Sequence, residues 1–255
     1  MNSRSLRALV LSPLLALALA CSSAPVRPTA TEATREAGAG EYTLAKDITV
    51  RRIAPGVWVH TTLSDEDFGL IPANGLIVED GDGSLLVDTG WNQRQAEQLV
   101  DWAANTLGKP VHAAVATHFH DDRTAGIPVL SARGIPVHGL EDTVKLAKER
   151  GKPVPTRSFT ESTTLGPLEL FFPGAGHAPD NIVVVHRDSQ VMFGGCFVKD
   201  AAAKDLGNLG DAVVAAWPAS LERVQTRYPD TRIIVPGHGA PGGPELLSHT
   251  QALLR

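Results

Sequence analysis

The stretch VHAAVATHFHDDR, residues 111–123, decides the fold of this chain. Its first half is small and apolar, which predicts a buried β-strand over residues 111–117. Its second half then places His118, His120 and Asp122 at alternating positions. Alternate residues of an extended chain project to one side, so these three side chains can converge on an ion. Loops at strand ends are where α/β proteins place ligands, and the stretch therefore predicts a metal site there.

Strands and helices alternate on both sides of this stretch. Short apolar or alternating runs between turn residues predict further strands at 48–53, 57–62, 75–79, 84–88, 168–172, 182–186, 191–194 and 232–236. Helical spacing of apolar residues predicts helices at 92–107, 126–132, 141–150, 217–228 and 244–254. Two runs of strands, each followed by helix and strand, indicate the α/β class. We expect a four-layer αβ/βα sandwich, with two mixed β-sheets face to face and helices on the outside.

The composition excludes several classes of protein. Of the 255 residues, 43% are hydrophobic and 20% charged, which is typical of a soluble globular domain that needs no disulfides. The formal net charge is −5 and no basic cluster occurs, so we expect no nucleic-acid partner. No feature indicates a protein partner, and a monomer is the expectation.

The N-terminus has the pattern of a secretory signal. Residues 1–20 combine Arg4 and Arg7 with a short apolar run, which predicts export to the periplasm. The small residues before Cys21 resemble a bacterial lipobox, which would make Cys21 a lipid anchor in the outer membrane. The alternative is a plain cleavage site that leaves Cys21 free. Residues 21–41 are predicted to form a flexible tether, and the folded domain is expected over 42–255.

Three further motifs follow predicted strands and lie beside glycine. They are Gly176-His177, Gly194-Gly195-Cys196 and Pro236-Gly237-His238-Gly239. Taken singly, a loop histidine is usually a hydrogen-bonding residue and a buried cysteine a small apolar one. Together with the first stretch, they predict a metal centre of histidine, aspartate and cysteine ligands. The remaining histidines lack such a setting and are expected to be structural: His60, His112, His138, His186 and His249.

With these motifs the sequence resembles the class B metallo-β-lactamases, subclass 1, over residues 42–255. Three longer segments also match, namely GHAPDN at 176–181, GGCFVKD at 194–200 and NLGDA at 208–212. The resemblance implies the metallo-β-lactamase fold and two Zn²⁺ per chain. It assigns the first zinc to His118, His120 and His177, and the second to Asp122, Cys196 and His238.

The resemblance also implies a reaction. It is hydrolysis of the β-lactam ring of penicillins, cephalosporins and carbapenems by a zinc-bound hydroxide, which confers antibiotic resistance. Three protein ligands per zinc leave a position open, as catalytic rather than structural sites do. Asp122, Asn208 and Lys199 are the expected catalytic residues, with Asn208 at the lactam carbonyl and Lys199 at the substrate carboxylate.

Other residues are expected to support the site. Asp88 and Arg123 are candidates for outer hydrogen-bond partners of the ligands, and the alternative for Asp88 is to cap the following helix. Residues 63–72 join two strands, and the resemblance implies that this loop closes over substrate, with Phe68 in apolar contact. Trp91 would line the same mouth, and the alternative for Trp91 is core packing.

Two other functions remain open from the residues. The first is another hydrolase of the same fold, such as a glyoxalase-II-type thioesterase. Such enzymes have the pattern His-x-His-x-Asp-His, with an aspartate near the position of Cys196. In this chain Arg123 replaces the last histidine of the pattern, and Cys196 replaces the aspartate. The second is a non-catalytic zinc-binding protein of the envelope, which would need neither Lys199 nor an open coordination position.

Overall fold

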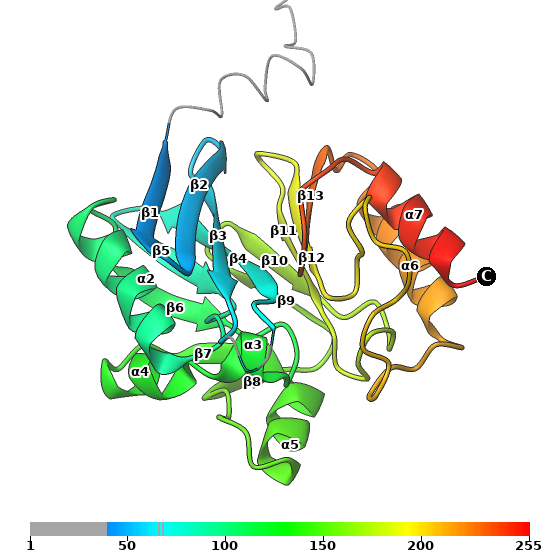
Figure 1. Ribbon diagram of the computed structural model, residues 1–255, viewed down its shortest axis with the longest axis horizontal. Helices are drawn as coiled ribbons and strands as arrows, with labels where there is room; N and C mark the ends of the chain where they lie inside the picture. The colour runs from blue at the N-terminus through cyan, green and yellow to red at the C-terminus, as the bar shows by residue number, and fades with distance from the viewer. Residues whose placement is uncertain (1–39, 66, 68) are drawn as a thin grey trace, which may run out of the picture.

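Two β-sheets lie face to face in the computed structural model, and helices cover their outer faces (Figure 1). The structure describes residues 40–65, 67 and 69–255. This arrangement confirms the four-layer sandwich expected from the sequence. The predicted signal segment, most of the predicted tether and Cys21 lie outside the described residues. None of the helices within the described ranges is both long and apolar enough to cross a membrane.

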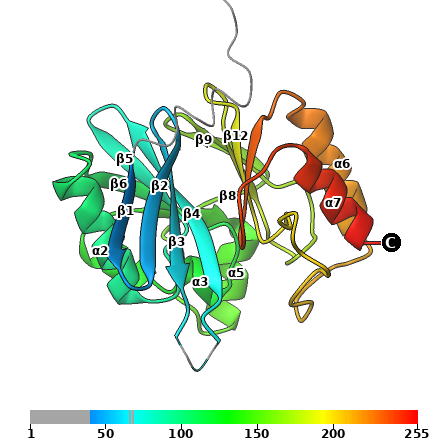
Figure 2. The same cartoon turned by 45° about the horizontal axis from the view of Figure 1, so that its top comes forward.

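The first sheet contains the strands of the N-terminal half. Its order is β1 (Glu41–Ala45), β2 (Ile48–Ala54), β3 (Val57–Leu63), β4 (Pro72–Asp80), β5 (Gly83–Val87), β6 (Val111–Val115), β7 (Val137–Leu140) and β8 (Arg157–Phe159). Neighbours from β1 to β5 are antiparallel and those from β5 to β8 are parallel, so the sheet is mixed. Figure 2 shows β3 and β4 side by side as they run toward the connection at 64–71.

The second sheet is smaller and also mixed. Its order is β13 (Ile233–Pro236), β12 (Val191–Gly195), β11 (Val183–His186), β10 (Leu168–Phe171) and β9 (Ser162–Leu165). Only β12 and β13 pair in parallel among these strands. The parallel pair matters for function because the carboxyl ends of β12 and β13 then lie at the same edge of the sheet.

Alternation along the strands builds three apolar layers. In β3, Val57 and Val59 face the second sheet, whereas Trp58 between them faces the helices. The layer between the sheets is closed from the other side by Phe193 and Val184. The outer helices of the first sheet are α2 (Gln93–Asn105) and α4 (Ile127–Ala132), and those of the second are α6 (Trp217–Arg227) and α7 (Glu245–Leu253).

Four strands were not predicted: β1, β7, β8 and β9. Each has three to five residues, and β1, β8 and β9 are largely exposed or half-buried. A run this short carries too few apolar residues to show a period of two. Pairing with a longer neighbour places these strands. The remaining predicted helices and strands occur within one to three residues of their expected ends.

Candidate metal centre

The chain segments that follow four strands or turns meet at one edge of the sandwich. His118 and His120 follow β6 and lead into the short helix α3 (Asp121–Thr124), which carries Asp122. His177 lies in the turn between β10 and β11. The last two ligands come from the parallel pair, since Cys196 directly follows β12 and His238 follows β13.

The structure brings His118, His120 and His177 together as one triad. His120 Nδ1 lies 3.1 Å from His118 Nε2 and 3.3 Å from His177 Nε2. A zinc ion with Zn–N bonds of about 2.0–2.1 Å in a tetrahedron separates its nitrogen ligands by roughly 3.3 Å. The spacing of these three nitrogens therefore fits a tetrahedral zinc ion.

Asp122, Cys196 and His238 form a second triad. Cys196 Sγ lies 3.1 Å from His238 Nε2 and 3.8 Å from Asp122 Oδ2, and the last two atoms are 3.5 Å apart. Tetrahedral zinc with one sulfur, one nitrogen and one oxygen ligand gives ligand separations of roughly 3.4–3.6 Å. Among the described residues, the two triads are the groups of three or more ligand side chains close enough to share an ion.

The protein environment favours the metal-binding protonation states. Burial holds the pKa of His118 well below its usual value, which keeps the imidazole neutral. Burial alone would raise the pKa of the Cys196 thiol, but it lies well below its usual value, and the positive charge of Arg123 is the largest of the effects that lower it. A neutral imidazole and a thiolate are the forms that bind metal.

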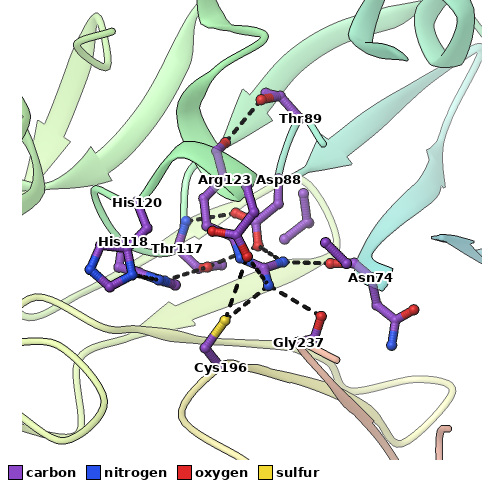
Figure 3. A network of polar contacts seen from close by, with 12 residues as sticks. Asn74, Asp88, Thr89, Thr117, His118, His120, Arg123, Cys196 and Gly237 are labelled. Atoms are coloured by element: carbon purple, nitrogen blue, oxygen red, sulfur yellow. Dashed lines mark hydrogen bonds and ion pairs between the residues drawn. The ribbon is translucent and has the colours of Figure 1, made fainter. Parts of the chain in front are cut away.

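Arg123 connects the second triad to the first sheet (Figure 3). Its guanidinium is fully buried and lies 2.7 Å from Asp122, 3.1 Å from Asp88 and 2.9 Å from Cys196 Sγ. The same group donates to the backbone oxygens of Asn74 (2.6 Å) and Gly237 (3.2 Å). The structure therefore places Arg123 beside two proposed ligands.

Asp88 is fully buried beside the ligands and does not cap a helix. Its carboxylate accepts the Thr117 backbone N–H at 2.8 Å and the Thr117 hydroxyl at 2.9 Å (Figure 3). Asn92, whose side chain accepts the Gln95 N–H at 3.0 Å, caps α2 instead. Of the two expectations for Asp88, helix capping is wrong. Asp88 holds Thr117, and with it the chain just before His118.

Two of the candidate ligand histidines have outer partners that fix their orientation. His120 Nε2 donates to Asp211 Oδ2 at 3.1 Å, and His238 Nδ1 donates to the Pro72 carbonyl at 2.6 Å. Each contact leaves the other ring nitrogen free of a proton and directed at its triad. Asp211 was not predicted as a site residue, although it belongs to the matched segment at 208–212.

Asn74 and Gly237 were also missed. Asn74 donates through Nδ2 to the carbonyls of Pro236 (3.0 Å) and Gly239 (2.8 Å), which links β4 to the His238 turn. A Cβ on Gly237 would lie 2.5 Å from the Cys196 nitrogen, so only glycine fits there. The glycines around His238 were visible in the sequence, but the close approach of Cys196 was not.

The predicted substrate residues lie around this edge. The Trp91 and His238 ring centroids are 6.4 Å apart, which places Trp91 beside the second triad. Lys199 Nζ lies 5.5 Å from the centre of the Trp217 ring. Asn208 is exposed, and its side-chain oxygen accepts the Gly210 N–H at 2.9 Å. Phe68 lies outside the described residues.

His60 shows how a buried histidine outside the triads is used. Its Nε2 lies 3.2 Å from the carbonyls of both Val87 and Asp88, and burial lowers its pKa to about 4. A Cβ on Gly75 would lie 2.2 Å from this nitrogen, so glycine makes room for the ring. His60 therefore connects β3 to the end of β5, in agreement with the structural role expected for it.

Comparison with known proteins gives a consistent result. The model of the metallo-beta-lactamase superfamily matches residues 68–238. A protein of Bacteroides fragilis named metallo-beta-lactamase type 2 is 38% identical over 216 residues, which is 83% of this chain and 87% of that protein. A Bacillus cereus protein of the same name is 39% identical over 212 residues, covering 82% of this chain and 83% of its own length.

Solved structures resemble the whole described domain. The metallo-beta-lactamase FIM-1 from Pseudomonas aeruginosa, in its mono-zinc form, superposes with a TM-score of 0.79 at 38% identity, over 83% of this chain and 97% of that one. A metallo-beta-lactamase from Erythrobacter litoralis gives a TM-score of 0.81 at 37% identity, over 84% and 99%.

Proposed function

Since the chain belongs to the metallo-beta-lactamase superfamily, we propose that it hydrolyses the β-lactam ring of antibiotics in a zinc-dependent reaction. The observation that carries this proposal is the pair of ligand triads at one edge of the sandwich. Each triad has three protein ligands at separations that suit zinc, and three ligands leave a coordination position for water or substrate. Bound zinc would supply a Lewis acid that activates water and polarises the lactam carbonyl.

We further propose that the chain holds two zinc ions, one in each triad, and that the two triads differ in affinity. The carboxylate of Asp122 and the thiolate of Cys196 attract a cation, but the Arg123 guanidinium lies within 3 Å of both side chains. Among the described residues, the imidazole rings of the histidine triad form hydrogen bonds to one another and to Asp211, and none of their hydrogen bonds involves an arginine or lysine. The second triad should therefore bind zinc more weakly than the first.

The chain's own residues would bind and orient the substrate. Lys199 offers an ammonium group beside the Trp217 ring, suited to the carboxylate that β-lactams carry. Asn208 is exposed on the loop that also carries Asp211, and its amide would donate to the lactam carbonyl as charge develops there. Trp91, which lies beside His238, would supply apolar contact, and so would Phe68. This arrangement supports carbapenems as substrates along with penicillins and cephalosporins.

The thioesterase alternative is less well supported. At position 123 such enzymes have a histidine. Here the residue is Arg123, whose guanidinium pairs with Asp88 and Asp122. Arginine carries a fixed positive charge and has no free lone pair for a metal. Cys196 likewise stands where those enzymes have an aspartate. Both positions favour β-lactam hydrolysis.

We also propose that the protein is exported to the periplasm as a monomer and that Cys21 is its lipid anchor. The support is the pattern of residues 1–20 and the small residues before Cys21. A Cys21→Ser variant should move from the membrane fraction to the soluble periplasm. If wild type and variant both fractionate as soluble, the anchor is absent.

The first test of function is hydrolysis of a carbapenem by the purified protein, followed by absorbance with and without a zinc chelator. We expect turnover that the chelator abolishes and that added zinc restores. A folded, zinc-loaded protein that leaves carbapenems, penicillins and cephalosporins intact would overturn the proposal.

Cys196→Ser separates an enzyme from a protein that only stores zinc. The variant replaces the soft thiolate ligand of the second triad by a hydroxyl and leaves the histidine triad intact. We expect it to retain one zinc ion while kcat falls by at least tenfold. Loss of metal by the variant, when the wild type shows no turnover, would favour the storage protein.

A further inference from the structure

Asp211 accepts hydrogen bonds through its carboxylate from two side chains, those of His120 and Arg150. It lies in the segment between β12 and α6, residues 196–216, which contains neither helix nor strand. One carboxylate oxygen accepts from His120 Nε2. The other accepts from Arg150 Nη2 at 2.9 Å. The position of Asp211 therefore depends on side chains that reach it from outside its own segment.

Arg150 comes from the end of α5 (Glu141–Glu149), where it is the C-cap residue. Its backbone N–H donates to the Leu146 carbonyl at 2.9 Å, so the helix fixes where its side chain starts. The guanidinium carbon also lies 5.6 Å from the centre of the Phe119 ring. That ring contacts the His120 ring edge-on, with centroids 4.6 Å apart. Arg150 thus contacts Asp211 and Phe119, two of the side chains that contact His120.

We propose that Arg150 is a positioning residue of the histidine triad. It holds Asp211 on His120 Nε2 and packs over the Phe119 ring that contacts His120, and so keeps His120 Nδ1 directed at His118 and His177. Within the described residues, Arg150 contacts Asp211 and Phe119 through its side chain, and neither is a candidate metal ligand. The inference rests on zinc binding by this triad, which is part of the proposed function.

Apolar packing anchors α5, the helix that ends at Arg150. Phe119 is buried in a small apolar cluster with Ala147 of α5 and Ala178, the residue after His177. All three histidines of the triad therefore have a sequence neighbour in this cluster, since Phe119 lies between His118 and His120 and Ala178 follows His177. Because α5 is anchored there, the Arg150–Asp211 contact can hold the loop of Asp211 against the triad.

Lys152 provides a matched comparison. It lies two residues after Arg150 and pairs with Asp121 at 2.6 Å, so it also connects this turn to the segment of the ligands. Its side chain is 34% exposed, whereas that of Arg150 is 54% exposed. The Lys152 contact does not reach Asp211 or Phe119. Removing the Lys152 side chain should therefore change neither the orientation of His120 nor the zinc affinity of the histidine triad.

The test measures zinc affinity directly, by competition of the purified enzyme with a chromophoric chelator. Removal of an outer partner of a ligand usually costs 10- to 100-fold in affinity, and Arg150 acts one contact further out and is half-exposed. We expect Arg150→Ala to weaken the tighter zinc site roughly three- to tenfold. Arg150→Lys should restore part of this loss, and Lys152→Ala should match wild type.

Two further readouts separate positioning from a general loss of structure. Cobalt in the histidine triad should show altered ligand-field bands in Arg150→Ala but not in Lys152→Ala. Arg150→Ala should also add little to Asp211→Asn, because both changes remove the same contact. An unchanged zinc affinity in a folded Arg150→Ala would overturn the proposal, as would equal losses in the two alanine variants. Weaker zinc binding by Arg150→Ala in a protein that hydrolyses no β-lactam would refute the proposed function alone.

Discussion

Arg123 is the residue whose environment the sequence reveals least. The sequence shows an arginine next to two aspartates, but Asp88 and Cys196 approach it from 35 and 73 residues away. The result is one buried cation beside the carboxyl groups of Asp88 and Asp122 and the sulfur of Cys196, and burial raises the pKa of Asp88 to about 7. Such a group is stable only while all its members are present, because each charge left alone in the interior is costly.

Arg123→Met should therefore destabilise the protein strongly. The variant keeps apolar volume but leaves the Asp88 and Asp122 carboxylates without their cation, which we expect to cost about 3–5 kcal/mol. Urea unfolding of the metal-free proteins measures this difference. Adding Asp88→Asn should recover part of the loss, and an Arg123→Met variant as stable as wild type would contradict the role of this network.

Asp180 gives a pH dependence. It is fully buried between His177 and β11, and its carboxylate oxygens make no well-formed hydrogen bond within the described residues. Burial raises its pKa to about 6, although the Thr143 hydroxyl and the Phe119 backbone partly oppose this. The folded protein thus keeps a proton on Asp180 at pH values where the unfolded chain has released it.

Stability should consequently fall as the pH rises from about 4 to 6, the interval between the unfolded and folded pKa values. The contribution of Asp180 to this fall is at most about 3 kcal/mol. In Asp180→Asn this contribution is absent, so the difference in unfolding free energy between variant and wild type should grow over that interval. A difference that stays constant from pH 4 to 7 would show that Asp180 ionises normally.

The six candidate ligands could be predicted from the sequence because each stands in a local pattern, a polar or glycine-flanked residue just after a strand. Asp211, Asn74 and Arg150 could not. Their roles depend on contacts between segments distant in the chain, such as the 61 residues between Arg150 and Asp211. No periodicity or spacing records such a contact.

At the scale of elements, α2 and α4 meet through a glycine. A Cβ on Gly126, the residue before α4, would lie 2.3 Å from the Ala96 Cβ of α2 and 2.7 Å from the Thr89 Cβ. The close contact brings α4 down onto the first sheet just after α3. Gly126 was predicted as the start of this helix, but its contact with Ala96 was not predictable, since helical periodicity says nothing about the distance between two helices.

Gly126→Ala should cost about 1–3 kcal/mol, the usual penalty for adding a methyl group to a filled interior. Thermal or urea unfolding measures it. Ser131→Ala, on an exposed position of the same helix, is the control and should change stability by less than about 0.5 kcal/mol. Equal stability of the two variants would mean that α4 can move away at no cost.

The short strands show the same limit. β7 and β8 extend the first sheet beyond β6 by parallel pairing, and their residues alone carry no clear signal. The longer strands were predicted because alternating residues such as Val57, Trp58 and Val59 face two different apolar layers. An element is predictable to the extent that its own residues record the face it buries.

At the scale of the molecule, each triad takes ligands from both halves of the chain. His118, His120 and Asp122 follow strand β6 of the first sheet, whereas His177, Cys196 and His238 border strands of the second. Zinc would therefore bind the folded state and not the unfolded one, and would add its binding free energy to the stability of the fold.

Removal of zinc should lower the melting temperature by roughly 10 °C when the metal had been in thousandfold excess over its dissociation constant. Differential scanning calorimetry with and without chelator measures the shift. His177→Ala should reduce it, because this variant breaks the histidine triad. A melting temperature that does not respond to zinc would contradict preferential binding of zinc to the folded state.

Because each triad takes candidate ligands from both halves, the chain could be divided into two fragments that each lack a complete triad. The first sheet ends at Phe159 and the second begins at Ser162, so a break after Thr160 would yield two fragments with three candidate ligands each. Neither fragment would contain a complete triad. Only reassembly across the facing sheets would recreate the sites, so recovered turnover from the two pieces would act as a zinc-gated reporter of their association.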